Sequence, residues 1–373
     1  MAEAGALAAW QVPARASALV AAGREILNLT IGDPEGPPHP AIVRAVGEAL
    51  AAGRTHYSPL GGEPKLRRAI GRWLGVPEAA VTVMPGAQAA VFAAVQITAG
   101  PGDEVILTDP HYATYPGVVA ASGARAVAVP VRAGDFGLDR EAIAGAVTPA
   151  TRAILVASPA NPTGAALAPE DFAFLRALCD RADLWLLVDE TYARFAFARP
   201  HVSALAEGPV GRTITIGTLS KSHAMTGFRL GWAVAPAEAT AALEEWCAAA
   251  TFGVSQFIQD AAVAALQVPE AELLPWRRSF RARAALVVDR VNRIPGLCAR
   301  MPDGGMFVMA DARAVGADDV ALALRLLEET GVALLPGSGF GRGGAGHLRI
   351  SLTPSEETLA RALDRLARAL SRV

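Results

Sequence analysis

The sequence predicts an α/β protein with two domains. Its 373 residues exceed the roughly 150 that a single domain typically takes. The composition is 52% hydrophobic and 19% charged, which is typical of a folded globular chain and excludes a disordered one. Between about residues 80 and 236, short apolar strands alternate with helical segments. This alternation predicts βαβ units and a mostly parallel sheet that helices cover.

The N-terminal elements precede this alternation. An Ala-rich stretch predicts a helix over 5–22, and apolar residues predict a short strand over 26–31. Gly and Pro dominate residues 32–38, which predicts a loop. The next two helices are expected at about 40–52 and 62–74.

The alternating region begins with a strand and then a helix from Gly86 to about Ala99. Further strands are expected at 104–108, 126–131, 153–157, 184–188, 213–217 and 230–234, and further helices at 115–122 and 169–181. The strand at 184–188 is entirely apolar, as expected of a strand that is buried on both faces.

Long helices replace this pattern after about residue 236, including one over 270–292. The remaining strands are expected at 306–310, 332–335 and 347–351, with helices at 318–329 and 355–370. This part predicts a smaller α+β domain that the N-terminal arm joins. We therefore expect a large domain over 37–285 and a small domain formed by 1–36 and 286–373, although no linker marks the boundary.

Charge, cysteine and histidine content argue against several classes of protein. The 34 basic and 36 acidic residues give a net charge of −2, which predicts no nucleic-acid partner. Three cysteines without a CxxC pair predict no disulfide framework, and six scattered histidines predict no metal site. Because the chain has neither a long apolar run nor a basic signal region, we expect no membrane partner and a cytoplasmic location.

Only two of the 34 basic residues are lysines, Lys65 and Lys221. Lys65 lies on the polar side of a predicted helix, which is typical of a surface lysine. Lys221 follows the predicted strand 213–217, at the sheet edge where open α/β proteins bind ligands. Small hydroxyl residues surround it and Arg229 follows, which favours a nucleophilic amine beside a phosphate over an ordinary surface lysine.

Two further candidates also follow strands. Asp189 ends the apolar strand 184–188, where an ionised carboxylate needs a cation or a strong donor; a simple capping role is the alternative. Asn161 begins an Asn-Pro turn after the strand 153–157, and most such turns are structural.

Helix starts and arginines supply the remaining candidates. Small residues around Ala87 and Gln88 open a helix whose free N–H groups suit an anion. Arg349, in the strand 347–351, suits a two-point clamp on a carboxylate, although most arginines are surface residues. The glycine-rich tract 337–341 resembles a dinucleotide loop, but a strand and not a helix follows it, so we set that interpretation aside.

The order of these residues resembles the aspartate aminotransferase superfamily, the class I and II aminotransferases of PLP fold type I. The tracts that carry the resemblance are Gly32-Asp33-Pro34, Tyr57 to Gly62, Ser158 to Gly164, Asp189 to Tyr192, Ser220 to Arg229, and Arg349-Ile350-Ser351. The resemblance implies a large domain with a mostly parallel seven-stranded sheet covered by helices, plus a smaller α+β domain. The family often continues Gly-x-Pro-Asp-Phe, which this chain lacks after Pro34, so the pocket lip near Glu35 is expected to differ.

The resemblance implies that the chain binds pyridoxal 5′-phosphate (PLP). Lys221 would carry it as a Schiff base and move the Cα proton, and Asp189 would keep its ring nitrogen protonated. Asn161 and Tyr192 would hydrogen-bond the phenolate oxygen, and Tyr112 would stack on the ring. The phosphate would be bound by Ala87, Gln88, Thr218, Ser220, Arg229 and, across a homodimer, by Tyr57 of the neighbouring subunit.

The substrate carboxylate would be bound by Arg349, with help from Asn161 and the backbone of Gly32. The tracts 220–227, 259–262 and 302–309 are most similar to arginine–pyruvate aminotransferases. The resemblance therefore implies a ping-pong transfer from L-arginine, or a related guanidino or cationic L-amino acid, to pyruvate or another 2-oxo acid. Glu35 is the candidate partner for the guanidinium, with Asp33 as the second candidate. The alternative is that Glu35 only contacts solvent, as most charged side chains in loops do.

Two other functions stay open. One is a broad aspartate, alanine or aromatic aminotransferase. The other is a PLP lyase or synthase of the same fold, which would keep Lys221 and Asp189 and could serve the biosynthesis of an arginine-derived unusual amino acid. A transcriptional regulator with this fold needs a preceding DNA-binding domain, and we expect none because only about thirty residues precede Gly32.

Overall fold

A seven-stranded sheet forms the centre of the larger part of the computed structural model, which describes residues 4–197, 199–206 and 211–371. The strand order is β2-β8-β7-β6-β5-β3-β4, and only β8 runs antiparallel to its neighbours. The strands are β2 (Val81–Met84), β3 (Glu104–Asp109), β4 (Arg125–Pro130), β5 (Thr151–Ala157), β6 (Trp185–Asp189), β7 (Thr213–Thr218) and β8 (Gly231–Val234). The predicted mostly parallel seven-stranded sheet is confirmed.

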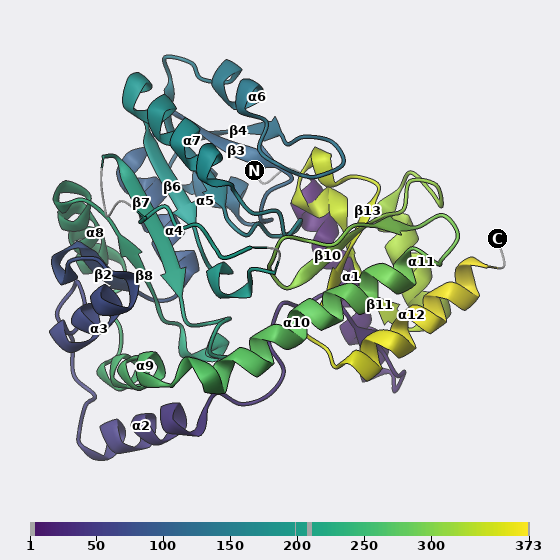
Figure 1. Cartoon of the computed structure of the whole chain (residues 1–373), viewed down its shortest axis with the longest axis horizontal. Coiled ribbons are helices and arrows are strands. Elements are labelled where there is room, and N and C mark those ends of the chain that lie inside the picture. The colour runs from purple at the N-terminus through teal and green to yellow at the C-terminus, as the bar shows by residue number, and fades with distance from the viewer. Residues whose placement is uncertain (1–3, 198, 207–210, 372–373) are drawn as a thin grey trace.

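Helices cover both faces of this sheet because successive side chains of a strand point to opposite faces (Figure 1). On β6, Leu187 packs in the cluster with α4, α5 and α8, whereas Leu186 packs in the cluster with α6 and α7. These helices are α4 (Ala87–Thr98), α5 (Tyr115–Ala121), α6 (Arg140–Gly145), α7 (Pro169–Ala182) and α8 (Ala237–Ala250). Three more, α2 (Pro40–Ala51), α3 (Pro64–Leu74) and α9 (Gln256–Gln267), pack together at the β2 end.

The smaller part contains a four-stranded sheet, in the order β12-β13-β10-β9, and the parallel pair β1-β11. Its strands are β1 (Leu27–Asn28), β9 (Cys298–Ala299), β10 (Phe307–Asp311), β11 (Val332–Ala333), β12 (Leu335–Pro336) and β13 (His347–Ser351). Its helices are α1 (Ala4–Ala21), α11 (Asp319–Thr330) and α12 (Glu356–Leu370). One hydrophobic cluster joins α1, α11 and α12 to these strands, so the N-terminal arm packs with the C-terminal part.

The long helix α10 (Glu270–Val291) runs from the larger part into the smaller one (Figure 1). It contacts the short turn η2 (Ala193–Phe195) at one end and β10 and α12 along its length. The predicted boundary at 285/286 therefore falls inside a continuous helix, and the residue bounds of the two domains stay a prediction. No helix in the described part of the chain is long and apolar enough to span a membrane.

Short turns complete the structure: η1 (Glu78–Ala80), η3 (Thr226–Phe228), η4 (Gly337–Phe340) and η5 (Arg342–Gly344).

The carboxyl ends of β5, β6 and β7 lie side by side and place the side chains of the functional site. The register pairs Ala157 of β5 with Asp189 of β6, and Asp189 with Ile216 of β7. Asp189 and Thr218 thus end neighbouring parallel strands at one edge of the sheet, as the apolar strand pattern predicts.

Candidate active site

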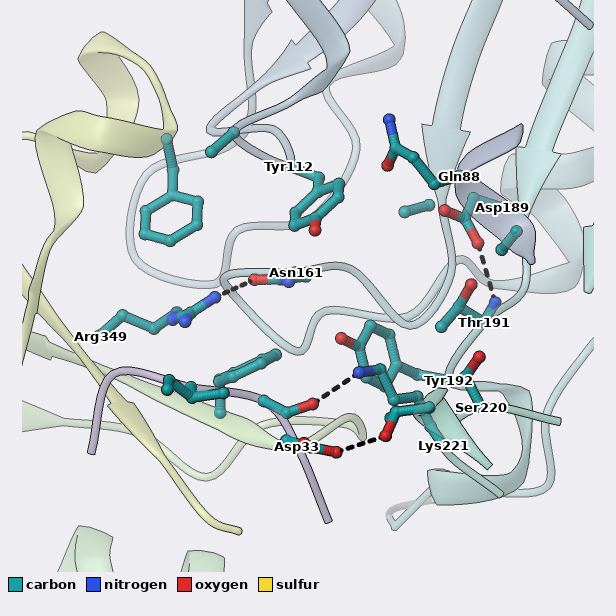
Figure 2. Close-up of a pocket in the computed structure, with 18 of the residues that line it drawn as sticks. Asp33, Gln88, Tyr112, Asn161, Asp189, Thr191, Tyr192, Ser220, Lys221 and Arg349 are labelled. Carbon is teal, nitrogen blue, oxygen red and sulfur yellow. Dashed lines mark hydrogen bonds between the residues drawn. The ribbon is translucent and has the colours of Figure 1, made fainter. Parts of the chain in front are cut away.

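A cavity of about 460 Å³ lies at this edge of the sheet, between the two parts of the chain. Its walls come from the segment after β1, from α4, from the loops after β3, β5, β6 and β7, and from β10, β12, η4 and β13 (Figure 2). Twelve of the fourteen predicted site residues line it: Gly32, Ala87, Gln88, Tyr112, Asn161, Asp189, Tyr192, Thr218, Ser220, Lys221, Arg229 and Arg349. The two that do not are Tyr57 and Glu35.

Lys221 follows β7 and reaches across the cavity to the N-terminal segment. Its Nζ donates a hydrogen bond to the Gly32 carbonyl oxygen at 2.6 Å (Figure 2). Burial lowers the pKa of this amine to about 8, and the charges of Arg229 and Arg349 act in the same direction, whereas Asp33 opposes them. A minor fraction of the amine is therefore unprotonated near neutral pH, far more than for an ordinary lysine, and the neutral form is the one that a nucleophile or base requires.

Asp189 is a buried carboxylate that receives two hydrogen bonds. The Tyr115 hydroxyl donates to Oδ2 at 2.8 Å, and the Thr191 backbone N–H donates to Oδ1 at 2.9 Å. Burial raises the pKa of Asp189, and the bonds from Thr191 and Tyr115 oppose that rise. Within the described residues it has no ion-pair partner. The site therefore offers a buried anion without a cation beside it.

Sequence reasoning missed Tyr115. The residue was assigned only as the start of a helix, and the structure agrees that it begins α5. Its side chain is 2% exposed, and a buried hydroxyl needs a partner, which is the signal that could have singled it out. The identity of that partner depends on tertiary structure, because Tyr115 and Asp189 are 74 residues apart.

Arg349 presents its guanidinium to the cavity from β13. Nη1 donates to Asn161 Oδ1 at 2.8 Å (Figure 2), and Nη2 donates to the Thr30 carbonyl oxygen at 2.5 Å. The guanidinium carbon lies 3.9 Å from the ring centre of Phe307 and 4.7 Å from that of Phe340. Nε is buried and has no hydrogen-bond partner among the residues that the structure describes. Burial lowers the pKa of Arg349 to about 10, and a bound carboxylate would supply the missing acceptor and counter-charge.

Tyr192 lies next to Asn161 in the same cavity. Burial raises the pKa of its hydroxyl, while a hydrogen bond with the Asn161 side chain opposes the rise. Tyr112 lies at the opposite wall in Figure 2, and its pKa is also raised by burial. A flat ligand that lies between Tyr112 and Lys221 would therefore contact the Tyr112 ring and could form hydrogen bonds with the side chains of Tyr192 and Asn161.

The start of α4 forms the polar end of the cavity. Gly86 precedes the helix with φ +84°, and the helix start has no side-chain cap. A Cβ at Gly86 would lie 2.5 Å from Arg229 Nη2, so the glycine lets this guanidinium approach the free N–H groups of Ala87 and Gln88. Arg229 has φ +52° and donates to the Thr226 carbonyl oxygen at 2.7 Å. A positive charge beside a helix N-terminus suits a phosphate.

Two buried hydroxyls adjoin this end. Thr218 Oγ1 lies 2.9 Å from Ser220 Oγ and donates to the Leu230 carbonyl oxygen at 2.6 Å. The Ser220 backbone N–H in turn donates to Thr218 Oγ1 at 3.0 Å. These bonds orient both side chains toward the cavity that they line.

Tyr57 and Glu35 lie outside the cavity. Tyr57 is 80% exposed and its ring centre lies 5.0 Å from that of Phe252. Glu35 is exposed, and its charge acts on Arg283 of α10, whose pKa it raises against the larger lowering by burial. The glycine-rich tract that was set aside has a different role: it forms η4 and brings Phe340 against Arg349.

Comparison with known proteins agrees with this geometry. A sequence model of the family "Aminotransferase class I and II" matches residues 24–366, which is most of the chain. The chain belongs to this family. The predicted resemblance is thereby confirmed, and the protein is an aminotransferase.

Several relatives of this aminotransferase are similar over nearly their whole length. It is 44% identical to the arginine–pyruvate transaminase of Pseudomonas aeruginosa, covering 96% of this chain and 94% of that one. It is 34% identical to an aspartate aminotransferase of Rhizobium meliloti, covering 97% and 93%. Among solved structures, the Thermus thermophilus aspartate aminotransferase with maleate superposes with a TM-score of 0.92 at 34% identity, covering 97% and 96%. Members of the family use pyridoxal phosphate.

Proposed function

We propose that this aminotransferase binds PLP in the cavity and moves the α-amino group of L-arginine, or of a related guanidino or cationic L-amino acid, to pyruvate or another 2-oxo acid. The observation that carries the proposal is one cavity with three complementary groups. Lys221 offers a partly neutral amine, Asp189 a buried carboxylate without a cation, and Arg349 a buried N–H without an acceptor.

The residues present fit PLP. A protonated ring nitrogen would supply the cation that Asp189 lacks, and a phosphate would meet the α4 N-terminus, Arg229 and the two hydroxyls. Tyr112 would stack on the ring, and Asn161 and Tyr192 would bind its phenolate oxygen. When bound, the cofactor supplies an electron-withdrawing ring that labilises the bonds at the substrate Cα.

The chain's own residues would then position and move protons. Lys221, whose pKa burial lowers to about 8, accepts and returns the proton at Cα in its neutral form, and the Gly32 carbonyl orients its Nζ. Arg349 binds the α-carboxylate, and the flanking Phe307 and Phe340 rings keep the guanidinium in place. Asp189 stays ionised against the ring nitrogen because Tyr115 and Thr191 donate to both of its oxygens.

The arginine donor is supported by the 44% identity to the arginine–pyruvate transaminase. A broad aspartate aminotransferase is the second candidate, supported by the relatives at 34% identity. Half-reactions of the PLP-loaded enzyme with arginine, ornithine, aspartate, alanine and phenylalanine distinguish the two. We expect arginine to convert the cofactor fastest. Faster conversion by aspartate or phenylalanine would replace arginine with the second candidate, and no aminated cofactor with any donor would favour a lyase or synthase.

We also propose a homodimer in which Tyr57 completes the phosphate site of the neighbouring subunit. Tyr57 is exposed and does not line the described cavity of its own chain, and both observations support a role in another chain. Phe252, its ring partner, is 56% exposed as well, so the pair presents apolar surface that a second subunit would cover. The cytoplasmic location stays a prediction.

A further inference from the structure

Five charged side chains line the cavity within the described residues: Asp33, Asp189, Lys221, Arg229 and Arg349. The proposed function uses four of them. Lys221 and Asp189 serve the reaction, Arg229 serves the phosphate, and Arg349 serves the α-carboxylate. Asp33 binds neither the cofactor nor the α-carboxylate in that proposal, although its charge raises the pKa of Lys221 against the effect of burial.

Asp33 is held in place although it has no ion pair. Its Oδ1 accepts a hydrogen bond from the Thr226 hydroxyl at 2.7 Å, and within the described residues no cation lies in ion-pair contact with its carboxylate. Figure 2 shows this contact on the N-terminal segment, beside the Gly32 carbonyl that receives Lys221. The side chain is exposed to the cavity, and a fixed carboxylate with a free oxygen is a ready acceptor for a guanidinium.

We propose that Asp33 is the specificity residue that binds the cationic side chain of the amino donor. This inference rests on the proposed function. The ligand class is a guanidinium or ammonium group at the end of a three- or four-carbon chain. Trp10, Pro13 and Ile31 line the same cavity, and Trp10 and Ile31 are 59% and 54% exposed, so apolar surface is available for the methylene groups.

The geometry favours Asp33 over Glu35 for this role. Glu35 does not line the cavity, and its charge acts on Arg283 of its own chain. Arg283 is fixed by Nη1 donating to the carbonyl oxygens of Leu352 and Thr353, at 3.1 and 2.7 Å. Glu35 thus has a charge neighbour away from the substrate, whereas Asp33 faces it.

The same residue disfavours acidic donors. The distal carboxylate of aspartate would approach Asp33, and like charges repel. Each cation that lines the described cavity of one chain already has a task, so a second substrate carboxylate would find no free partner there. Asp33 therefore selects for a cation and against an anion at the same point.

The test compares Asp33→Asn with Glu35→Gln in the PLP-loaded enzyme. The kcat/KM of the half-reaction is measured with arginine and with norleucine, an uncharged donor with a shorter, unbranched aliphatic side chain, and their ratio is the readout. The bound donor would remove water from its charge pair with Asp33, and removing one partner of such a pair costs enough to expect a fall in this ratio of about 30-fold for Asp33→Asn. Glu35→Gln should leave the ratio within about twofold, and Asp33→Glu, which keeps the charge, should retain more of it than Asp33→Asn.

A binding measurement removes the dependence on catalysis. Calorimetric titration of the same holoenzymes with 5-guanidinopentanoate and with hexanoate, neither of which carries an α-amino group, measures recognition alone. Asp33→Asn should weaken the first ligand relative to the second by a similar factor. A general loss of cofactor or fold would weaken both ligands equally.

The possible results distinguish a wrong assignment of Asp33 from a wrong amino donor. If wild type prefers arginine but Asp33→Asn lowers the ratio by less than tenfold, the assignment of Asp33 is wrong and the proposed function stands. A fall confined to Glu35→Gln also overturns it and transfers the role to Glu35. If wild type converts aspartate faster than arginine, the arginine donor itself fails, and the inference fails with it.

Discussion

The Tyr115 hydroxyl donates a hydrogen bond to the Asp189 carboxylate, with 2.8 Å between Oη and Oδ2. Tyr115 begins α5 after β3, whereas Asp189 ends β6, and β5 lies between these two strands. Burial raises the pKa of both groups, and the Asp189 charge raises that of Tyr115 further. Because the donor stays protonated, it favours the ionised carboxylate that a cofactor ring nitrogen requires.

Removing this hydroxyl should weaken cofactor binding. In Tyr115→Phe the ring still fills its site, but Asp189 loses this donor and keeps only those of Thr191, and hydrogen bonds to charged groups contribute about 1.5–3 kcal/mol. We expect the affinity for PLP to fall about tenfold or more, together with a shift in the pH dependence of the cofactor absorbance. Equilibrium titration of the cofactor-free protein measures both. An unchanged affinity and an unchanged spectrum would show that Thr191 alone suffices.

Covalent attachment of PLP is expected at Lys221. Burial lowers the pKa of this amine to about 8, whereas Lys65 is an exposed residue of α3. Borohydride reduction of the loaded enzyme followed by peptide mapping should recover the pyridoxyl group on Lys221. Lys221→Ala, treated identically, is the control and should carry no label. Label on Lys65 would contradict the assignment.

A methyl group at Gly86 should damage the phosphate site. It would lie 2.5 Å from Arg229 Nη2 and would force an L-residue to adopt φ +84°. We expect Gly86→Ala to lose affinity for PLP by at least tenfold and for pyridoxal, which lacks the phosphate, much less. The matched control is Gly47→Ala, where a Cβ meets nothing within 4 Å. Equal losses for both ligands would assign the damage to the fold instead of the phosphate.

The homodimer proposal predicts an effect of Tyr57 in the neighbouring subunit. A Tyr57→Phe/Arg349→Ala double variant is inactive in its own sites through the arginine, so mixed dimers with wild type report only the wild-type site. If Tyr57 acts across the interface, the activity of the mixed dimer, which comes only from that site, should need a higher PLP concentration to saturate than the activity of the wild-type dimer. Dimers of wild type with the single Arg349→Ala variant are the control. If both mixed dimers have the same cofactor affinity, Tyr57 does not contribute to the phosphate site of the neighbouring subunit.

His223 should make the fold sensitive to acid. Burial, and then the charges of Arg277 and Arg194, lower the pKa of its imidazole to about 3. Since the unfolded chain binds this proton near pH 6.5 and the folded chain does not, the free energy of unfolding is highest above pH 6.5 and falls between 6.5 and 3. Between pH 7 and pH 5, the protonation of His223 should lower the free energy of unfolding by about 2 kcal/mol.

Urea unfolding of the wild type and of His223→Gln at pH 7 and pH 5, at matched protein concentration, measures this loss. The variant should lose about 2 kcal/mol less than wild type over the interval. The exposed His56 supplies the control, and His56→Gln should follow wild type. A variant at position 223 that also follows wild type would mean that the folded protein takes up the proton without cost.

The sequence by itself determined the sheet and the place of its strand ends. Short continuous apolar runs, as in 184–188, are local, and they predict a covered parallel strand without knowledge of the rest of the chain. Asp189 and Lys221 are read directly from their position after such runs. The scarcity of lysine left a single candidate in that context, and the resemblance of the ordered tracts then predicted the family.

Only the tertiary structure decided which side chains meet. Arg349 and Asn161 are 188 residues apart, and Asp33 and Thr226 are 193 apart, so no local pattern relates them. Asp33 and Glu35 are nearly equivalent in sequence, yet the chain turns one toward the cavity and the other toward Arg283. Likewise, η4 was recognisable as a glycine-rich tract but not as the support for Phe340 beside Arg349. Hydrophobic periodicity specifies the elements, whereas the contacts between their ends depend on how the two parts of the chain pack.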